Sequence, residues 1–210
     1  MKTLLLIIFT LTLNSGFAQT EQDSYKIYSQ VINGITQSWI NKPVNSIIII
    51  KQLTDSLELY QLDELTQDSS SQYAIQHWFA NDYSLWLRLK TDKDFKAAIT
   101  NLTSNFINHP TIYPTLLDLD NVSIETLTSN EFHDFLFKGN HYKDKGWKKI
   151  ERIYGTHFVF QLSKVEYQGN YATFYYSYRC GGLCGKGGVV LMENVNGKWH
   201  ILKDFELWES

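Results

Sequence analysis

Two cysteines, Cys180 and Cys184, have the clearest chemical potential in this chain, and they stand within a run of glycines. The run is Arg179-Cys180-Gly181-Gly182-Leu183-Cys184-Gly185-Lys186-Gly187-Gly188. A thiol pair can form a disulfide, bind a metal ion or take part in redox exchange. We predict the disulfide, because these are the only cysteines of a chain whose N-terminus indicates export.

A disulfide here closes a ring of about five residues, which stabilises the fold by only about 2 kcal/mol in the chain-entropy relation. Its predicted role is therefore local. It would hold a loop in which the backbone amides of Gly181 and Gly182 face a ligand, with Arg179 and Lys186 favouring an anionic group. The alternative is a rigid hairpin tip that binds nothing.

The other thiol chemistries have weaker support. Zinc would need further ligands, such as His157 or His200, and a single C-x-x-x-C pair is not a zinc signature. Redox pairs usually have C-x-x-C spacing at the start of a helix, whereas strand-like segments flank this loop. We assign no metal ligand and no cofactor.

A second cluster of reactive side chains comprises Glu131, His133, Asp134 and His141. It could serve as a metal site or an acid and base pair. However, His133 and Asp134 are neighbours that point in different directions on a helix, and His141 lies beyond a loop, so a solvated surface is the main interpretation. With no G-x-S-x-G, H-E-x-x-H, P-loop or dinucleotide motif, no catalytic residue is predicted. Whether the protein is an enzyme stays open.

The N-terminus has the pattern of a secretory signal peptide over residues 1–18. Lys2 precedes an apolar run over residues 3–13, and Gly16-Phe17-Ala18 suits cleavage after Ala18. The run is shorter than the roughly 20 residues that span a bilayer, and no later run reaches that length. No cysteine lies nearby for lipoprotein processing. We expect a periplasmic or secreted protein without a membrane span.

Composition limits the partners. The chain carries 19 basic and 22 acidic residues, a formal net charge of −3, which gives no attraction to nucleic acid or anionic lipid. The partner is predicted to be an unknown envelope or extracellular ligand. Aromatic residues are abundant, with 13 Tyr, 12 Phe and 6 Trp. Most are expected in a β-rich core, and the alternative is an aromatic platform for sugars or peptides.

The region 19–122 is predicted to be mostly helical with short strands. Apolar spacing indicates a helix over residues 21–39, with Tyr28, Val31, Ile32, Ile35 and Trp39 on one face. A strand is predicted over 44–53, a helix over 73–80 and a strand over 85–90. A further helix is predicted to follow a cap at Thr91. Its core face would carry Phe95, Ala98, Ile99, Leu102 and Phe106. Residues 110–122 are predicted to form a loop, and any flexible boundary between the two regions is expected there.

The region 123–210 is predicted to hold helices followed by an antiparallel sheet. A helix over 131–137 is expected to follow a Ser129 cap, and a second helix to end at Gly155. Beyond Thr156 the apolar period becomes two, which predicts a four-strand antiparallel meander, with a tight hairpin at Asn196-Gly197. The fold class is α+β, with the N-terminal region packed on this meander, either as one domain with it or as two.

The segment from Trp147 to Ser210 resembles the C-terminal part of small secreted proteins of unknown function that are common in Bacteroidota. The matching residues are Trp147, Ser163, Val165, Cys180-Gly181-Gly182-Leu183-Cys184-Gly185, Gly197-Lys198-Trp199 and Leu207-Trp208-Glu209-Ser210. The resemblance implies no activity. The segment Asn196 to Ile201 is also similar to the last hairpin of cone-shaped α+β domains of the nuclear-transport-factor-2 type, a likeness of fold only.

Two functions follow as hypotheses. The first is a non-enzymatic secreted domain that binds a ligand or partner through the sheet face and the cysteine loop. The alternative is an extracytoplasmic hydrolase with its site in the concavity of the C-terminal sheet, using polar residues such as His157, Tyr176 or Glu193. A purely structural envelope protein is a third reading.

Overall fold

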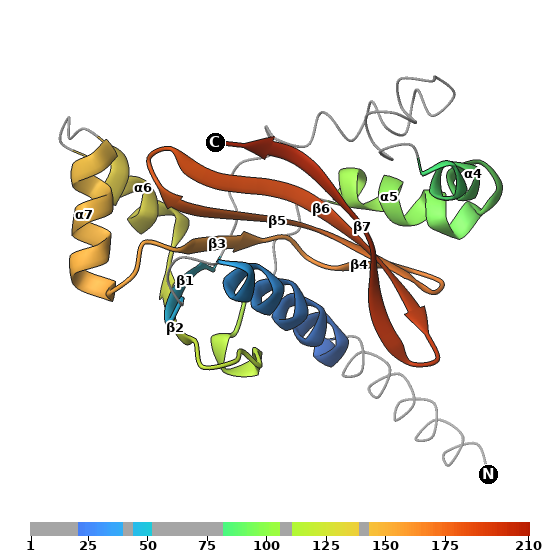
Figure 1. The fold of residues 1–210 in the computed structure, drawn as a ribbon, viewed down its shortest axis with the longest axis horizontal. Helices are drawn as coiled ribbons and strands as arrows, with labels where there is room; N and C mark the ends of the chain where they lie inside the picture. Colours follow the sequence, from blue (N-terminus) through green and yellow to red (C-terminus); the bar gives the residue numbers. More distant parts are fainter. Residues whose placement is uncertain (1–20, 40–43, 52–81, 106–110, 139–142) are drawn as a thin grey trace, which may run out of the picture. The chain divides into compact units, whose positions relative to one another are not determined.

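A computed structural model describes residues 21–39, 44–51, 82–105, 111–138 and 143–210 (Figure 1). The predicted signal peptide over 1–18 and the predicted helix over 73–80 lie outside the described residues. The described chain forms two compact units. One contains residues up to 45 together with 113–123, and the other contains 46–112 and 124–210.

The first unit is built on the predicted N-terminal helix, which covers residues 21–38. Polar side chains at every fourth position of this helix hold the segment 113–120. Tyr25 and Ser29 accept hydrogen bonds from the backbone N–H groups of Tyr113 and Asp118, both at 2.9 Å. The Asn33 amide bonds to the backbone of Asp118 and Asp120, each at 3.1 Å. The stretch expected to be a loop is thus tied down, and it includes the 3-10 helix η1, Pro114–Leu116.

The second unit contains a mixed sheet of seven strands among the described residues, in the order β2-β1-β3-β5-β6-β7, with β4 also paired to β5. The strands are β1 (Ser46–Ile50), β2 (Ser123–Leu127), β3 (Val159–Leu162), β4 (Glu166–Gln168), β5 (Tyr171–Gly181), β6 (Cys184–Val195) and β7 (Lys198–Glu209). Strands β3, β5, β6 and β7 are antiparallel neighbours, so the predicted meander is confirmed. Strand β1 adds to it in parallel with β3. The α+β class is also confirmed.

The β6–β7 hairpin turns at Asn196 and Gly197, as predicted. Both have positive φ, 53° and 82°, as the favoured two-residue hairpin turn requires. The Asn194 side chain accepts a hydrogen bond from the backbone N–H of Gly197 at 2.9 Å, which stabilises the turn.

The prediction of a strand over 85–90 is wrong, because this segment forms the helix α4 (Tyr83–Thr91). The Asp82 carboxylate caps the helix by accepting from the backbone N–H groups of Ser84 and Leu85. Leu85 and Leu89 are buried one helical turn apart, whereas Leu87 is 46% exposed. Three leucines at a period of two suggested a strand, but only the pair with helical spacing reaches the core.

Helix α5 (Lys93–Asn105) follows directly, and its cap is Asp92 rather than the predicted Thr91. The Asp92 carboxylate accepts from the backbone N–H groups of Asp94 and Phe95, both at 3.0 Å. Phe95, Ala98 and Ile99 are buried, as predicted. The expected core side chains of Leu102 and Phe106 lie outside the described side chains.

Helices α6 (Ser129–Phe137) and α7 (Lys143–Tyr154) form the other helix pair. The α6 cap is Thr128 rather than Ser129, because Thr128 and Glu131 complete a capping box in which each side chain binds the other's backbone N–H. Helix α7 ends before Gly155, which has a φ of 69° and ends the helix as predicted.

Both helix pairs cover one face of the sheet at different places (Figure 1). Helices α4 and α5 pack on β5, β6 and β7 through a cluster that includes Tyr175, Val189 and Phe205. Helices α6 and α7 pack on β1, β2 and β3 in a second cluster that includes Val159. Val159 of β3 pairs with Arg179 of β5, so these two side chains point to the same face of the sheet. Tyr175 is four residues before Arg179 on β5 and therefore points to that face too, so both clusters lie on one face of the sheet. No helix among the described residues has the length and apolar character to cross a bilayer.

Candidate functional site

The cysteine loop is the tip of the β5–β6 hairpin, and Cys180 and Cys184 form a disulfide across its base. Their Cα atoms are 5.0 Å apart. Gly181 pairs with Cys184, which leaves Gly182 and Leu183 as the turn. Gly181 has a φ of 142°, a conformation that side chains disfavour. Leu183 is 91% exposed and projects from a tip that is covalently closed.

Two of the glycines that follow the second cysteine, Gly185 and Gly187, are explained by Trp208 on β7. Gly187 pairs with Trp208, and a Cβ atom on Gly187 would overlap the indole ring. A Cβ on Gly185 would lie 2.8 Å from the backbone oxygen of Tyr178 and 3.1 Å from the same indole. The indole Nε1 donates to the Tyr175 hydroxyl at 3.2 Å. The glycines therefore make room for a tryptophan that lies flat on the hairpin backbone.

The two cations of the predicted binding loop lie on opposite faces of the hairpin. Arg179 pairs with Gly185 and Lys186 pairs with Tyr178, so their side chains alternate. The Arg179 guanidinium lies over the Trp208 ring, 4.6 Å from its centroid. The structure does not bring these cations together beside Gly181 and Gly182.

Lys186 belongs to a polar cluster on the other face. Its ammonium group forms ion pairs with Asp204 at 3.4 Å and Glu206 at 3.2 Å. Burial opposes the charge, but these carboxylates raise the pKa of Lys186 overall. Asp204 also accepts a hydrogen bond from Tyr176 at 2.8 Å. Burial and the Asp204 charge raise the pKa of Tyr176 far above its ordinary value, so this phenol stays protonated.

The aromatic residues of the last third lie mainly in the core. Tyr171, Phe174, Tyr175 and Tyr176 are each at most 6% exposed. Among the described residues near the loop, Leu183 is the large apolar side chain that is strongly exposed, and no cluster of exposed aromatic residues accompanies it. The sheet face therefore offers no aromatic platform beside the loop in the described part of the chain.

The residues of the hydrolase alternative do not converge. Tyr176 bonds to Asp204 on one face of the sheet. Glu193 lies on the other face, where it accepts from Arg88 at 2.5 Å. His157 lies before β3 and stacks on Phe158, with its Nδ1 3.8 Å from Glu151.

The residues of the predicted acid and histidine cluster are mostly engaged separately. Glu131 completes the capping box of α6, and Asp134 pairs with Lys138 at 2.7 Å. The His133 ring contacts the Phe137 ring in a tilted arrangement, with centroids 4.8 Å apart. His141 lies outside the described residues. With the cysteines bonded to each other, the described chain contains no group of three metal-ligating side chains close enough to hold an ion.

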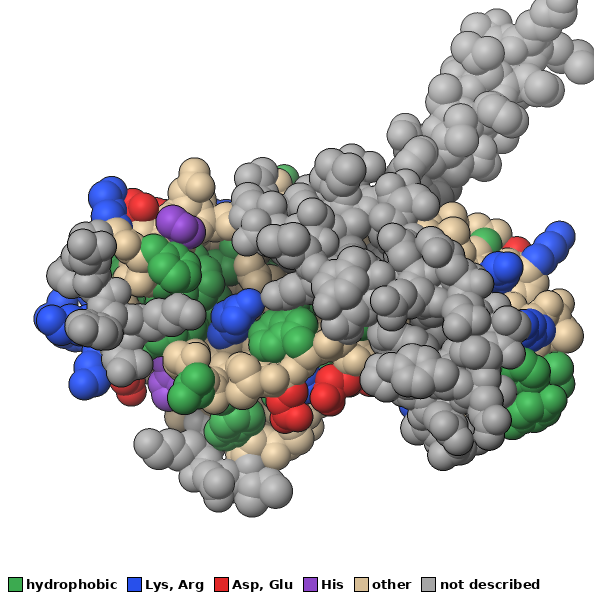
Figure 2. All heavy atoms as spheres, turned by 90° about the horizontal axis from the view of Figure 1, so that it is seen from above, with side chains coloured by type: hydrophobic (Ala, Val, Ile, Leu, Met, Phe, Trp, Pro, Cys, Tyr) green, Lys and Arg blue, Asp and Glu red, His purple; other side chains and the backbone are tan. Residues whose placement is uncertain are grey.

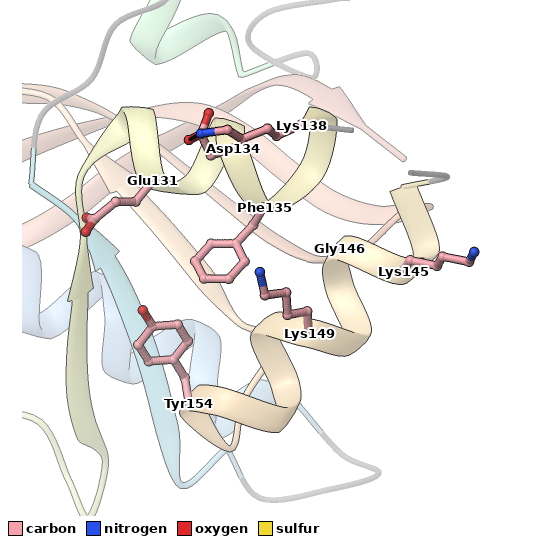
Figure 3. Close-up of a pocket in the computed structure, with 8 residues that line it drawn as sticks. All are labelled: Glu131, Asp134, Phe135, Lys138, Lys145, Gly146, Lys149 and Tyr154. Atoms are coloured by element: carbon pink, nitrogen blue, oxygen red, sulfur yellow. Dashed lines mark hydrogen bonds and ion pairs between the residues drawn. The ribbon is translucent and has the colours of Figure 1, made fainter. Parts of the chain in front are cut away.

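Two members of the acid and histidine cluster, Glu131 and Asp134, line a pocket between α6 and α7 with a volume of about 410 Å³, although the sequence was interpreted as a solvated surface there (Figure 3). Its lining residues are Glu131, Asp134, Phe135, Lys138, Lys145, Gly146, Lys149 and Tyr154. Gly146 was the residue in the sequence that could have indicated this pocket. A glycine inside a helix often marks a place where another part of the backbone packs closely against that helix. A Cβ atom on Gly146 would overlap the backbone oxygen of Phe135.

Comparisons with family models, with curated proteins and with solved structures found no match to this chain. The resemblance of the C-terminal third to small secreted proteins therefore stays a prediction.

Proposed function

We propose that this protein is a non-enzymatic binding domain that acts outside the cytoplasm and recognises a partner protein through the disulfide-bonded tip of the β5–β6 hairpin. The observation that carries the proposal is Leu183, which is 91% exposed on a turn closed by Cys180 and Cys184. The predicted sheet-face platform is not part of this proposal.

Two features support an extracytoplasmic location. The disulfide suits an oxidising compartment, because cytosolic thiols are normally kept reduced. The apolar N-terminal run and the small residues before position 19 favour a cleaved signal peptide.

The construction of the tip favours binding. Burying a leucine side chain against a partner gains about 1.5–3 kcal/mol. A turn that is already fixed loses little conformational entropy when it binds, so more of this gain appears as affinity. Trp208, held between the Gly185 and Gly187 backbone and the Arg179 guanidinium, stiffens the hairpin immediately behind the tip.

Site-specific photocrosslinking tests the proposal. Leu183 is replaced by benzoylphenylalanine in the protein expressed in its native cell. The matched control places the same group at Val195, which is 45% exposed beside the β6–β7 turn. We expect one discrete crosslinked species from position 183 and none from position 195.

A third protein combines the label at position 183 with Cys180→Ser and Cys184→Ser. Loss of the covalent closure should lower the crosslinking yield several-fold. Equal labelling from positions 183 and 195, or no crosslink from position 183, would count against recognition through the tip.

A further inference from the structure

We propose that the pocket between α6 and α7 is a second binding site, which takes a small organic anion with a flat apolar body, such as an aromatic carboxylate. Lys149 would pair with the carboxylate, while Phe135 and Tyr154 would contact the ring. The lining residues come from α6, its C-cap Lys138 and α7, and none belongs to the hairpin tip, so the inference does not depend on the proposed partner binding.

The size of the pocket suits a small ligand. Its volume of about 410 Å³ lies within the range of roughly 300–1,000 Å³ that is typical of small-molecule sites. Gly146 allows α7 to approach the backbone of α6 at Phe135, so the pocket forms where two well-packed helices meet. Trp147 and Ile150 of α7 are buried in the core and fix the helix in place.

The charges around the pocket favour an anion. The acidic residues of the lining are already engaged, since Asp134 pairs with Lys138 at 2.7 Å and Glu131 accepts from the Thr128 backbone at 2.7 Å. Lys145 and Lys149 add two positive charges against the one negative charge on Glu131, so the lining, with three lysines and two carboxylates, has a formal net charge of +1. Figure 2 shows Lys and Arg side chains, with Asp and Glu side chains among them, on the side of the view where α6 and α7 lie.

The side chains that converge on the pocket favour an organic anion over a bare inorganic one. The Lys149 Nζ lies 5.0 Å from the centroid of the Phe135 ring, and the Tyr154 ring meets Phe135 edge-on at 6.1 Å (Figure 3). A ligand ring can therefore contact Phe135 and Tyr154 while its carboxylate reaches the ammonium group. Burial, with the charges of Glu131 and Glu125, raises the pKa of Tyr154, so its hydroxyl remains a hydrogen-bond donor.

Titrations of the ¹⁵N-labelled full-length mature protein with benzoate, benzamide and inorganic phosphate test this inference. Benzoate should produce saturable amide shifts in α6 and α7 with a dissociation constant in roughly the millimolar range, as expected for so small a ligand. Benzamide has the same shape without charge, and phosphate has charge without a ring. Both should bind at least about tenfold more weakly, a difference of about 1.4 kcal/mol.

Two lysine variants supply the matched comparison. Lys149→Met should weaken benzoate binding about tenfold, because the charge at the pocket is lost while the aliphatic stem is kept. Lys148→Met removes the neighbouring exposed lysine of α7, which does not line the pocket, and should leave binding unchanged. No saturable benzoate binding, equal binding of benzamide or phosphate, or equal loss in both variants would overturn the inference. None of these outcomes bears on crosslinking at the hairpin tip.

Discussion

At the scale of single residues, Gly185 and Gly187 of β6 are determined by Trp208. A glycine-rich loop flanked by cations suggests a cradle for an anion, but Gly185 and Gly187 are occupied on one face by an indole ring. The tryptophan stands more than twenty residues later in the sequence. Only the β6–β7 register brings it opposite these glycines, so the sequence pattern alone could not indicate the contact.

Gly187→Ala tests this packing. The added methyl group would overlap the indole, so we expect the free energy of unfolding to fall by about 1–3 kcal/mol, as in other overpacked interiors. Urea denaturation followed by tryptophan fluorescence measures the change. The control is Gly34→Ala, at an exposed helical position where a Cβ meets nothing within 4 Å. It should raise stability by about 0.5–1 kcal/mol. Unchanged stability in Gly187→Ala would show that the indole does not lie there.

Tyr176 makes stability depend on pH in the alkaline range. An unfolded tyrosine ionises near pH 10, whereas burial and Asp204 keep the proton on folded Tyr176 to higher pH. Above pH 10 the unfolded state therefore binds fewer protons than the native state, and the free energy of unfolding falls as pH rises. Below pH 10 this contribution is constant.

The comparison of wild type with Tyr176→Phe isolates this effect. Between pH 10 and 11, the wild-type free energy of unfolding should fall more steeply than that of the variant, by up to about 1.4 kcal/mol per pH unit. Urea denaturation at a series of pH values provides the measurement. Parallel pH profiles would mean that Tyr176 ionises normally in the native protein.

At the scale of elements, the period of the apolar residues was the most dependable sequence signal when it was long. Strands β5 and β7 contain the predicted apolar alternation and formed as expected. The glycine-rich stretch 179–188 was expected to be a loop, but it is strand except at Gly182 and Leu183, because the β5–β6 ladder continues to the disulfide. The nine-residue helix α4 was misread, because Leu85, Leu87 and Leu89 fit a strand as well as a helix. The Asp82 carboxylate stabilises the first turn of α4 by accepting hydrogen bonds from the Ser84 and Leu85 amides, and apolar periodicity does not reveal such a cap.

The β5–β6 hairpin should survive loss of its disulfide. The β5–β6 and β6–β7 ladders hold both strands independently of the tip, and the ring closed by the disulfide is small. The double variant Cys180→Ser with Cys184→Ser should lose about 2 kcal/mol of stability and keep its far-ultraviolet circular dichroism spectrum. Unfolding of the whole protein would contradict this account of the tip.

At the scale of the whole molecule, the sequence indicated the class of fold but not the complete sheet. Strand β1 pairs in parallel with β3 through Ile48 and Val159, more than a hundred residues apart, and no local pattern encodes such a contact. The α6–α7 pocket was missed for a related reason. Glu131 and Asp134 stood out in the sequence and do line it, but the pocket depends on the close approach of α7 to the α6 backbone at Gly146, which local sequence does not encode. The cysteine pair was the part of the candidate site that local sequence did predict.

The proposed function requires a protein that works outside the cytoplasm with a covalently closed hairpin tip. The most direct measurement is the intact mass of the protein recovered from its native cell, before and after reduction. We predict a chain that begins after Ala18 and weighs two hydrogens less than its fully reduced form. A chain that keeps residues 1–18 and has two free thiols would contradict both the location and the closed tip.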